Sequence, residues 1–217
     1  MASIQPPRAV DGALVLADIG GYTSFLTSVS TAHADDAFAD GRIPDAFAML
    51  SSLLDGIVGA MIPPFSLAKL EGDAVFAYAE DTADVPHGQA MLDCMTACHA
   101  EFRRRLAAAH VTWTCTCDAC LRIDTLDLKF VVHAGRFVVQ SIAGAPELVG
   151  SEVVMAHRLL KTEAAERLGS PAYALVSAAA ASRLAIPTAA GLPYDIEIEH
   201  YPTVRSFVFG LGSSAAG

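Results

Sequence analysis

Positive charge is scarce in this sequence. Its 217 residues contain 14 Lys and Arg against 24 Asp and Glu, which gives a net charge of −10. A surface of this sign repels the phosphates of DNA, RNA and anionic membranes. We therefore expect no nucleic acid and no membrane among its partners. A small nucleotide carried with magnesium remains compatible, because the metal supplies the positive charge.

Long apolar runs are missing as well. No stretch reaches the roughly 18 apolar residues of a membrane span, and residues 1–12 lack the hydrophobic core of a signal peptide. We expect a cytoplasmic protein whose five cysteines are reduced unless a metal holds some of them. The apolar content is nevertheless 53%, which favours an oligomer that buries an apolar face.

The chain also lacks the glycine patterns of a P-loop and a Rossmann fold, and it shows no Ser-His-Asp pattern. Instead, apolar periodicity predicts alternating strands and helices in one domain at 13–210, with a leader at 1–12, a tail at 211–217 and a cysteine-rich insert at about 110–124. The interpretation is an α+β fold with an antiparallel or mixed sheet and helices on one face. The expected strands are 13–18, 66–72, 74–80, 126–135, 136–144, 172–177, 195–201 and 204–210, and the expected helices are 45–62, 87–108, 151–168 and 178–185.

Two aspartates stand at the ends of apolar strands. Asp18 ends "ALVLAD" (13–18), and Asp73 lies in the turn of a hairpin, within "LAKLEGDAVFAY" (67–78). Carboxylates from two strand ends can hold a divalent ion, whereas a single strand-end aspartate often only caps a turn. On the same hairpin, Glu71 is expected to belong to the solvated face of its strand.

The sequence around these acids carries four motifs in register. "VLADIGGYTSFL" (15–26), "KLEGDAVFAY" (69–78), "LKFVVHAGRFVVQSIAG" (128–144) and "ELVGSEVVMAHRLLK" (147–161) resemble the four signatures of class III nucleotidyl cyclases, over roughly residues 13–160. The closest likeness is to a little-characterised bacterial cyclase-like set that also has a cysteine-rich insert. The resemblance implies a ferredoxin-like nucleotidyl-cyclase fold, with a central, mostly antiparallel sheet and helices packed on it.

The resemblance also implies a site for ATP, shared between the two subunits of a homodimer, with two Mg or Mn ions. The residues it assigns are Asp18, Ile19 and Asp73 for metal, Gly20, Gly21, Lys69 and Glu147 for the nucleotide, and Arg158 for the phosphate in the transition state.

The chain departs from active cyclases at two positions. Val154 stands where the family has an Asn that orients the ribose, and valine cannot form hydrogen bonds. Tyr201, with His200 beside it, stands where a lysine grips phosphate, although Arg205 could substitute. We therefore expect a nucleotide-binding protein with weak or lost cyclase activity. The alternative is a non-catalytic nucleotide-binding or zinc-stabilised signalling or scaffold module.

Three cysteines lie close together in the insert "CTCDAC" (115–120). Thiols at this spacing are typical of a tetrahedral zinc site, and Cys115, Cys117 and Cys120 are the expected ligands. A fourth ligand could come from Cys98, His99 or His110, or from a cysteine of a partner chain. The alternative is a reduced, metal-free loop.

Two further features are expected to be structural. The basic run 103–105 near the end of a helix is interpreted as a solvated face. His133, on a strand, is interpreted as a structural histidine and not as a general base.

Overall fold

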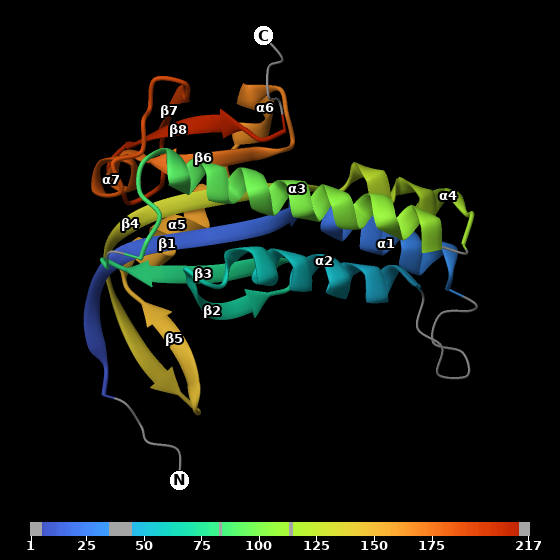
Figure 1. Cartoon of the computed structure of the whole chain (residues 1–217), viewed down its shortest axis with the longest axis horizontal. Helices are drawn as coiled ribbons and strands as arrows, with labels where there is room; N and C mark the ends of the chain where they lie inside the picture. The colour runs from blue at the N-terminus through green and yellow to red at the C-terminus, as the bar shows by residue number, and fades with distance from the viewer. Residues whose placement is uncertain (1–5, 35–44, 83, 113–114, 213–217) are drawn as a thin grey trace.

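The computed structural model describes residues 6–34, 45–82, 84–112 and 115–212 (Figure 1). The expected leader and tail therefore lie partly outside the described residues. The strands are β1 (Arg8–Gly20), β2 (Ser66–Glu71), β3 (Ala74–Glu80), β4 (Asp127–Ile142), β5 (Ala145–Val149), β6 (Tyr173–Ser177), β7 (Leu192–Ile196) and β8 (Val204–Gly210). The helices are α1 (Tyr22–Ala32), α2 (Asp45–Met61), α3 (Gln89–Thr112), α4 (Asp118–Leu121), the 3-10 helix η2 (Arg122–Thr125), α5 (Ser151–Leu159), α6 (Ala164–Leu168) and α7 (Ala178–Arg183).

The strands form one sheet in the order β2-β3-β1-β4-β6-β8-β7, and β5 pairs with β4 beside this path. Neighbouring strands are antiparallel except β4 and β6, which are parallel. This arrangement confirms the expected α+β class with a mostly antiparallel sheet.

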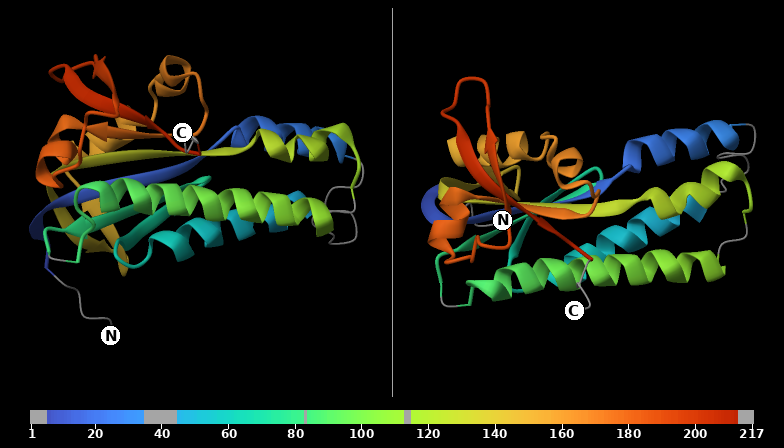
Figure 2. Two further views of the ribbon diagram at one scale, coloured as in Figure 1. Left: turned by 45° about the horizontal axis from the view of Figure 1, so that its top comes forward. Right: turned by 90° about the horizontal axis from the view of Figure 1, so that it is seen from above.

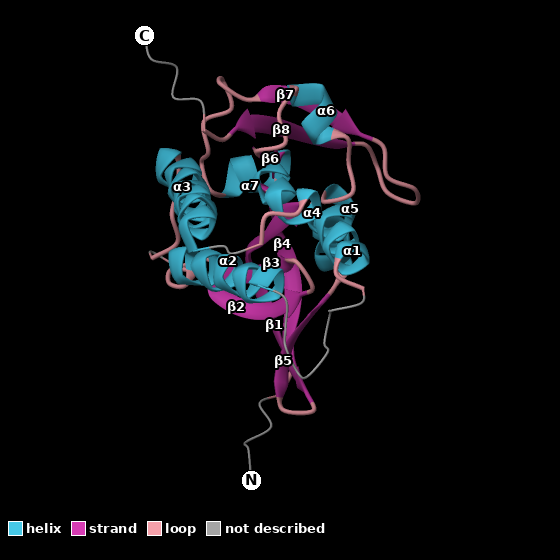
Figure 3. Ribbon diagram, turned by 90° about the vertical axis from the view of Figure 1, so that its right-hand side faces the viewer, coloured by secondary structure: helices cyan, strands magenta, loops and turns pink. Residues whose placement is uncertain are grey.

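Helices pack on both faces of the sheet, so the expectation of a single helical face was wrong. Successive residues of β1 alternate between two cores: Val15 and Ala17 belong to one, Leu14 and Leu16 to the other. Residues of α2 and α3 join the first core and residues of α5 the second (Figures 2 and 3). Because β1 is apolar on both sides, each side needs a cover. Among the described helices, none is both long and apolar enough to cross a bilayer.

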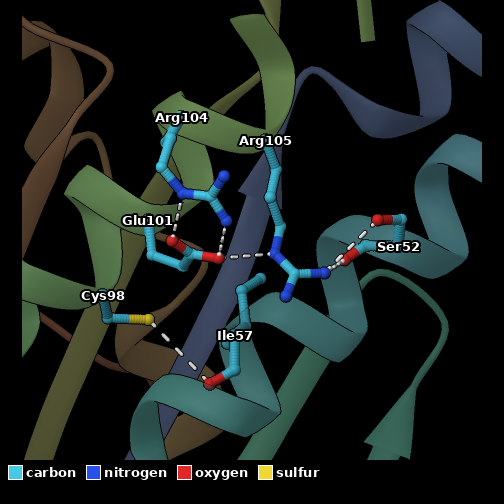
Figure 4. Close-up of polar contacts among 6 residues, drawn as sticks. All are labelled: Ser52, Ile57, Cys98, Glu101, Arg104 and Arg105. Carbon is cyan, nitrogen blue, oxygen red and sulfur yellow. Dashed lines mark hydrogen bonds and ion pairs between the residues drawn. The ribbon is translucent and has the colours of Figure 1, made fainter. Parts of the chain in front are cut away.

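The helices α2 and α3 are joined by polar contacts (Figure 4). Arg105 donates to Glu101 on its own helix at 2.7 Å and to the Ser52 carbonyl of α2 at 2.7 Å. Of the basic run Arg103–Arg105, the first two residues are exposed and Arg105 is partly buried. The expectation of a solvated face was therefore wrong for Arg105, whose long side chain reaches across to the neighbouring helix.

The strand β4 runs straight through Gly135, where a hairpin turn was expected. Gly135 pairs with Gly12 of β1, and a Cβ at position 135 would lie 2.6 Å from the Glu152 side chain. This glycine therefore makes room for a packed side chain. The turn comes later, at Ala143 and Gly144, which both have positive φ.

Two other strands have different limits from those expected. β1 begins at Arg8, inside the expected leader, and its Arg8 guanidinium contacts Glu80 of β3 at 2.7 Å. The expected strand at 195–201 is strand only to Ile196. The chain then turns, with the Tyr201 amide donating to the Ile198 carbonyl at 3.0 Å.

Candidate functional site

Asp18 lies near the end of β1, in a largely buried position. Its carboxylate is 3.0 Å from the ammonium group of Lys129, the residue that faces it on β4. Sequence reasoning missed Lys129, although a lysine in the apolar stretch "LKFVV" (128–132) was a signal, because buried charges need a partner.

Asp73 occupies the turn between β2 and β3, beside the same end of β1. Its carbonyl accepts a hydrogen bond from the Ile19 amide at 3.1 Å. Burial raises the pKa of the Asp73 carboxyl, and the negative charge of Asp18 raises it further. The structure thus brings the two sequence-predicted acids close enough to repel each other, and a cation between them would relieve that repulsion.

The turn after Asp18 leaves a helix end open. Gly21 has φ 83° and precedes the first residue of α1, and no side chain caps that helix. The positive φ would strain any other residue at position 21. A Cβ there would in addition lie only 3.3 Å from the Thr125 carbonyl oxygen. The first amides of an uncapped helix lack intrahelical partners and favour an anion.

A second polar group gathers on β2, β5 and α5. The Lys69 ammonium lies 3.1 Å from Glu71 and 3.3 Å from Glu147, and His157 contacts Glu71 at 2.8 Å. Hydrogen bonding to Glu71, more than to Glu147, raises the pKa of Lys69. Lys69 and Glu147, expected to share a role, are therefore adjacent in the structure.

Glu71 is a paired residue, so the expectation of a solvated strand face was wrong for it. Burial alone would raise the pKa of its carboxyl, but hydrogen bonds from His157 and Lys69 bring that pKa below its usual value. Strand alternation showed that Glu71 faces away from the core, but it could not show that α5 covers it.

Arg158 and Val154 lie on α5 next to this second group. Both line a shallow groove together with Val153, His157 and Lys161. Val154 is 46% exposed, and its side chain adds only an apolar surface there. On the other side of the sheet, Arg205 pairs with Asp195 at 3.5 Å.

The cysteines of the insert converge on a residue that the sequence did not single out. His33, which follows the last residue of α1, lies with Cys115, Cys117 and Cys120, and the four ligand atoms are all within 4.8 Å of one another. No local signal pointed to His33, because about 80 residues separate it from the cysteines.

Cys98 and His99, two of the expected fourth ligands, are placed elsewhere. His99 contacts Asp127 at 2.8 Å. Cys98 is buried, and burial raises the pKa of its thiol to about 12. The side chain of His110 lies outside the described residues.

A row of hydrogen bonds joins the buried Ser177 and His133 to the partly exposed Glu152. His133 contacts the Ser177 hydroxyl at 2.8 Å and Glu152 at 2.7 Å. The order resembles a hydrolase triad, but Ser177 has no exposed surface and its hydroxyl already accepts from the Ala180 amide at 3.2 Å. A nucleophile must reach its substrate. We therefore interpret these three residues as a structural hydrogen-bond network.

Comparison with known sequences finds one family and one curated relative. The family model described as "Protein of unknown function (DUF2652)" matches residues 50–167. An uncharacterised protein of Mycobacterium tuberculosis (Rv2561/Rv2562) is 34% identical over 118 residues, which are 53% of this chain and 50% of that protein. The match thus spans about half the length of the curated relative.

Comparison with solved structures identifies the fold. The adenylyl cyclase CyaB from Pseudomonas aeruginosa matches with a TM-score of 0.65 and 14% identity, over 98% of this chain and 100% of that one. A class III adenylyl cyclase-like ATP-binding protein from the same organism matches with a TM-score of 0.59 and 14% identity, over 87% of this chain and 37% of that one. The expected fold of class III cyclase catalytic domains is confirmed.

Proposed function

The chain belongs to the family described as proteins of unknown function, DUF2652, and we propose that it binds a nucleoside triphosphate, ATP by preference, together with Mg²⁺ or Mn²⁺. The observation that carries this proposal is that one cyclase-type fold holds both an acidic pair that suits a metal ion and a Lys–Glu pair that suits a base. Asp18 and Asp73 lie beside each other, since the Ile19 amide donates to the Asp73 carbonyl, and an open helix end follows. Lys69 of β2 contacts Glu147 of β5.

The acidic pair fits a hard divalent ion. Two carboxylates from Asp18 and Asp73, with the Ile19 carbonyl, are the oxygen donors that Mg²⁺ and Mn²⁺ prefer. A bound ion would neutralise phosphate charge and polarise the phosphorus that is attacked. The amides after Gly20 and Gly21 would then hold phosphate oxygens at the start of α1.

The Lys69 and Glu147 pair fits the edge of a base. An ammonium group only donates hydrogen bonds and a carboxylate only accepts them. Adenine offers one acceptor and one amino donor along that edge, so the pair matches both. Arg158, exposed on α5, would contact the phosphates from the same side.

We place the two groups of one site on different subunits of a homodimer. Two large apolar side chains are exposed on the elements that carry Glu147 and Arg158: Val149 of β5 at 46% and Val154 of α5 at 46%. Exposed apolar residues around a polar group are typical of an interface. A second copy would cover them and bring its own Asp18 and Asp73 toward Lys69.

Turnover is expected to be weak or absent. Val154 provides no hydrogen bond for the ribose, and a missing orienting group can cost about 10²–10³ in rate. Nucleotide binding depends on the acids and on Lys69, so it should survive better than cyclisation.

Calorimetry with ATP tests the proposal, with Mn²⁺ present and with EDTA. We expect binding at up to about millimolar affinity (roughly −4 kcal/mol) that requires the metal. Asp73→Asn should abolish it, whereas Asp195→Asn, at an exposed carboxylate on β7, should leave it unchanged. Absence of metal-dependent binding for every nucleoside triphosphate would overturn the proposal.

A further inference from the structure

We propose that His33, Cys115, Cys117 and Cys120 bind one Zn²⁺ ion. This site is separate from the nucleotide site and does not depend on the proposed function. The four residues provide one imidazole nitrogen and three sulfurs, and all four ligand atoms lie within 4.8 Å of one another.

The distances match a tetrahedral site. His33 Nε2 lies 3.6 Å from the sulfur of Cys115, 3.3 Å from that of Cys117 and 3.3 Å from that of Cys120. Zn–S bonds of about 2.3 Å and Zn–N bonds of about 2.0 Å place nitrogen and sulfur roughly 3.5 Å apart in a tetrahedron. A single ion can therefore bind all four atoms with only small side-chain adjustments.

The backbone around the cysteines is arranged in support of the sulfurs. Cys117 precedes the short helix α4, and its sulfur accepts from the Cys120 amide at 3.4 Å. Cys120 is 3% exposed, while the other three ligands are half-buried. A closed set of four protein ligands indicates a structural site and not a catalytic one.

The chemistry of the set favours zinc over the alternatives. Soft thiolates with an imidazole select zinc among the common divalent metals, and three Cys with one His is an established zinc set. All three cysteines are free, so no disulfide competes for their sulfurs. Simple packing of small apolar side chains does not account for an imidazole nitrogen that lies 3.3–3.6 Å from each of three sulfurs.

The zinc site would connect two segments that also contribute residues to the candidate nucleotide site. His33 follows the last residue of α1, and Gly21 precedes its first. The cysteines precede η2 and β4, the strand that carries Lys129. Helices α1 and α4 lie side by side (Figures 2 and 3). Zinc would hold these segments together at the end away from the Gly20 and Gly21 turn.

Metal analysis of the full chain, expressed with zinc and purified under reducing conditions, tests the proposal. We expect about one Zn²⁺ per chain, and a Co²⁺-substituted sample with the absorption of a tetrahedral thiolate site. Cys117→Ser and His33→Asn should lower zinc affinity by at least about 10-fold, the lower range for loss of a supporting residue. Cys94→Ser, at a cysteine of α3 outside the cluster, is the matched control and should keep its zinc.

Three results would overturn the proposal. They are zinc far below one equivalent in the wild-type chain, equal zinc loss in Cys94→Ser and Cys117→Ser, and stoichiometric iron with a visible iron–sulfur chromophore. Unchanged zinc affinity in His33→Asn would remove His33 from the site. If Cys117→Ser fails to fold, His33→Asn still tests the site, because it changes a residue just beyond the end of α1 and no strand.

Discussion

At the scale of single residues, the acidic pair already has a cation beside it. Lys129 contacts Asp18 at 3.0 Å, and its positive charge lowers the pKa of Asp73, although burial and Asp18 have larger effects that raise it. An ammonium group can partly replace a metal ion as the neighbour of a carboxylate. Lys129 therefore competes with the first divalent ion that enters the site.

Replacement of Lys129 tests this competition. In Lys129→Met, which removes the charge but keeps an unbranched side chain, Mn²⁺ alone should bind several-fold more tightly, since a partly exposed ion pair contributes about 1 kcal/mol. Mn²⁺ binding followed by electron paramagnetic resonance measures the change. Weaker Mn²⁺ binding in the variant would show that Lys129 supports the site and does not compete with the metal.

His133 should make folding stability depend on pH. Burial lowers its pKa in the folded chain, with only partial compensation by Glu152. As pH falls below the unfolded value of 6.5, the unfolded chain binds a proton before the folded chain does, and the free energy of unfolding decreases. The loss continues down to the lower folded pKa and then stops.

Urea unfolding between pH 7.5 and 5 measures this effect. The wild-type chain should lose more stability on acidification than His133→Gln, with a difference in slope of at most about 1.4 kcal/mol per pH unit for one proton. His200→Gln, at an exposed histidine, should follow the wild type. Equal slopes for all three proteins would remove His133 as the cause.

At the scale of elements, α1 has few buried residues for its length. It has 11 residues, and only Phe25 and Val29 are buried. Helices of this length are marginal without tertiary contacts. Its position therefore depends on its two ends, the turn at Gly21 and the cluster at His33.

Zinc removal should loosen α1 and α4 selectively. After treatment with a chelator under reducing conditions, amide exchange in Tyr22–Ala32 and Asp118–Leu121 should rise at least about tenfold, because a lost end restraint lowers the local opening energy. Exchange in α3, which packs against α2, should stay unchanged. Hydrogen exchange with mass spectrometry measures both, and an equal rise in all helices would contradict a local role for zinc.

At the scale of the whole molecule, motif order was enough to predict the fold class, because four signatures in register fix the strands that carry them. It was not enough for contacts between distant segments. His33 meets Cys115, and Lys129 meets Asp18, only through tertiary packing. The turn expected at Gly135 was also wrong because of a tertiary contact: the Glu152 side chain occupies the space that a Cβ at position 135 would need.

The central claim concerns two chains together, because each subunit is proposed to supply one half of every nucleotide site. Asp73→Asn damages the metal half, and Lys69→Ala damages the base half. A symmetric homodimer of either variant then contains two damaged sites. A heterodimer of the two variants contains one site with both defects and one intact site.

Metal-dependent ATP binding by this heterodimer is the most direct test. The two variants, carrying different tags, are co-expressed and purified through both tags, and calorimetry with Mn²⁺ counts the sites. We predict no sites in either variant homodimer and about one per heterodimer, half the number in the wild-type dimer. A heterodimer without any site would place the whole site within one chain and contradict the account.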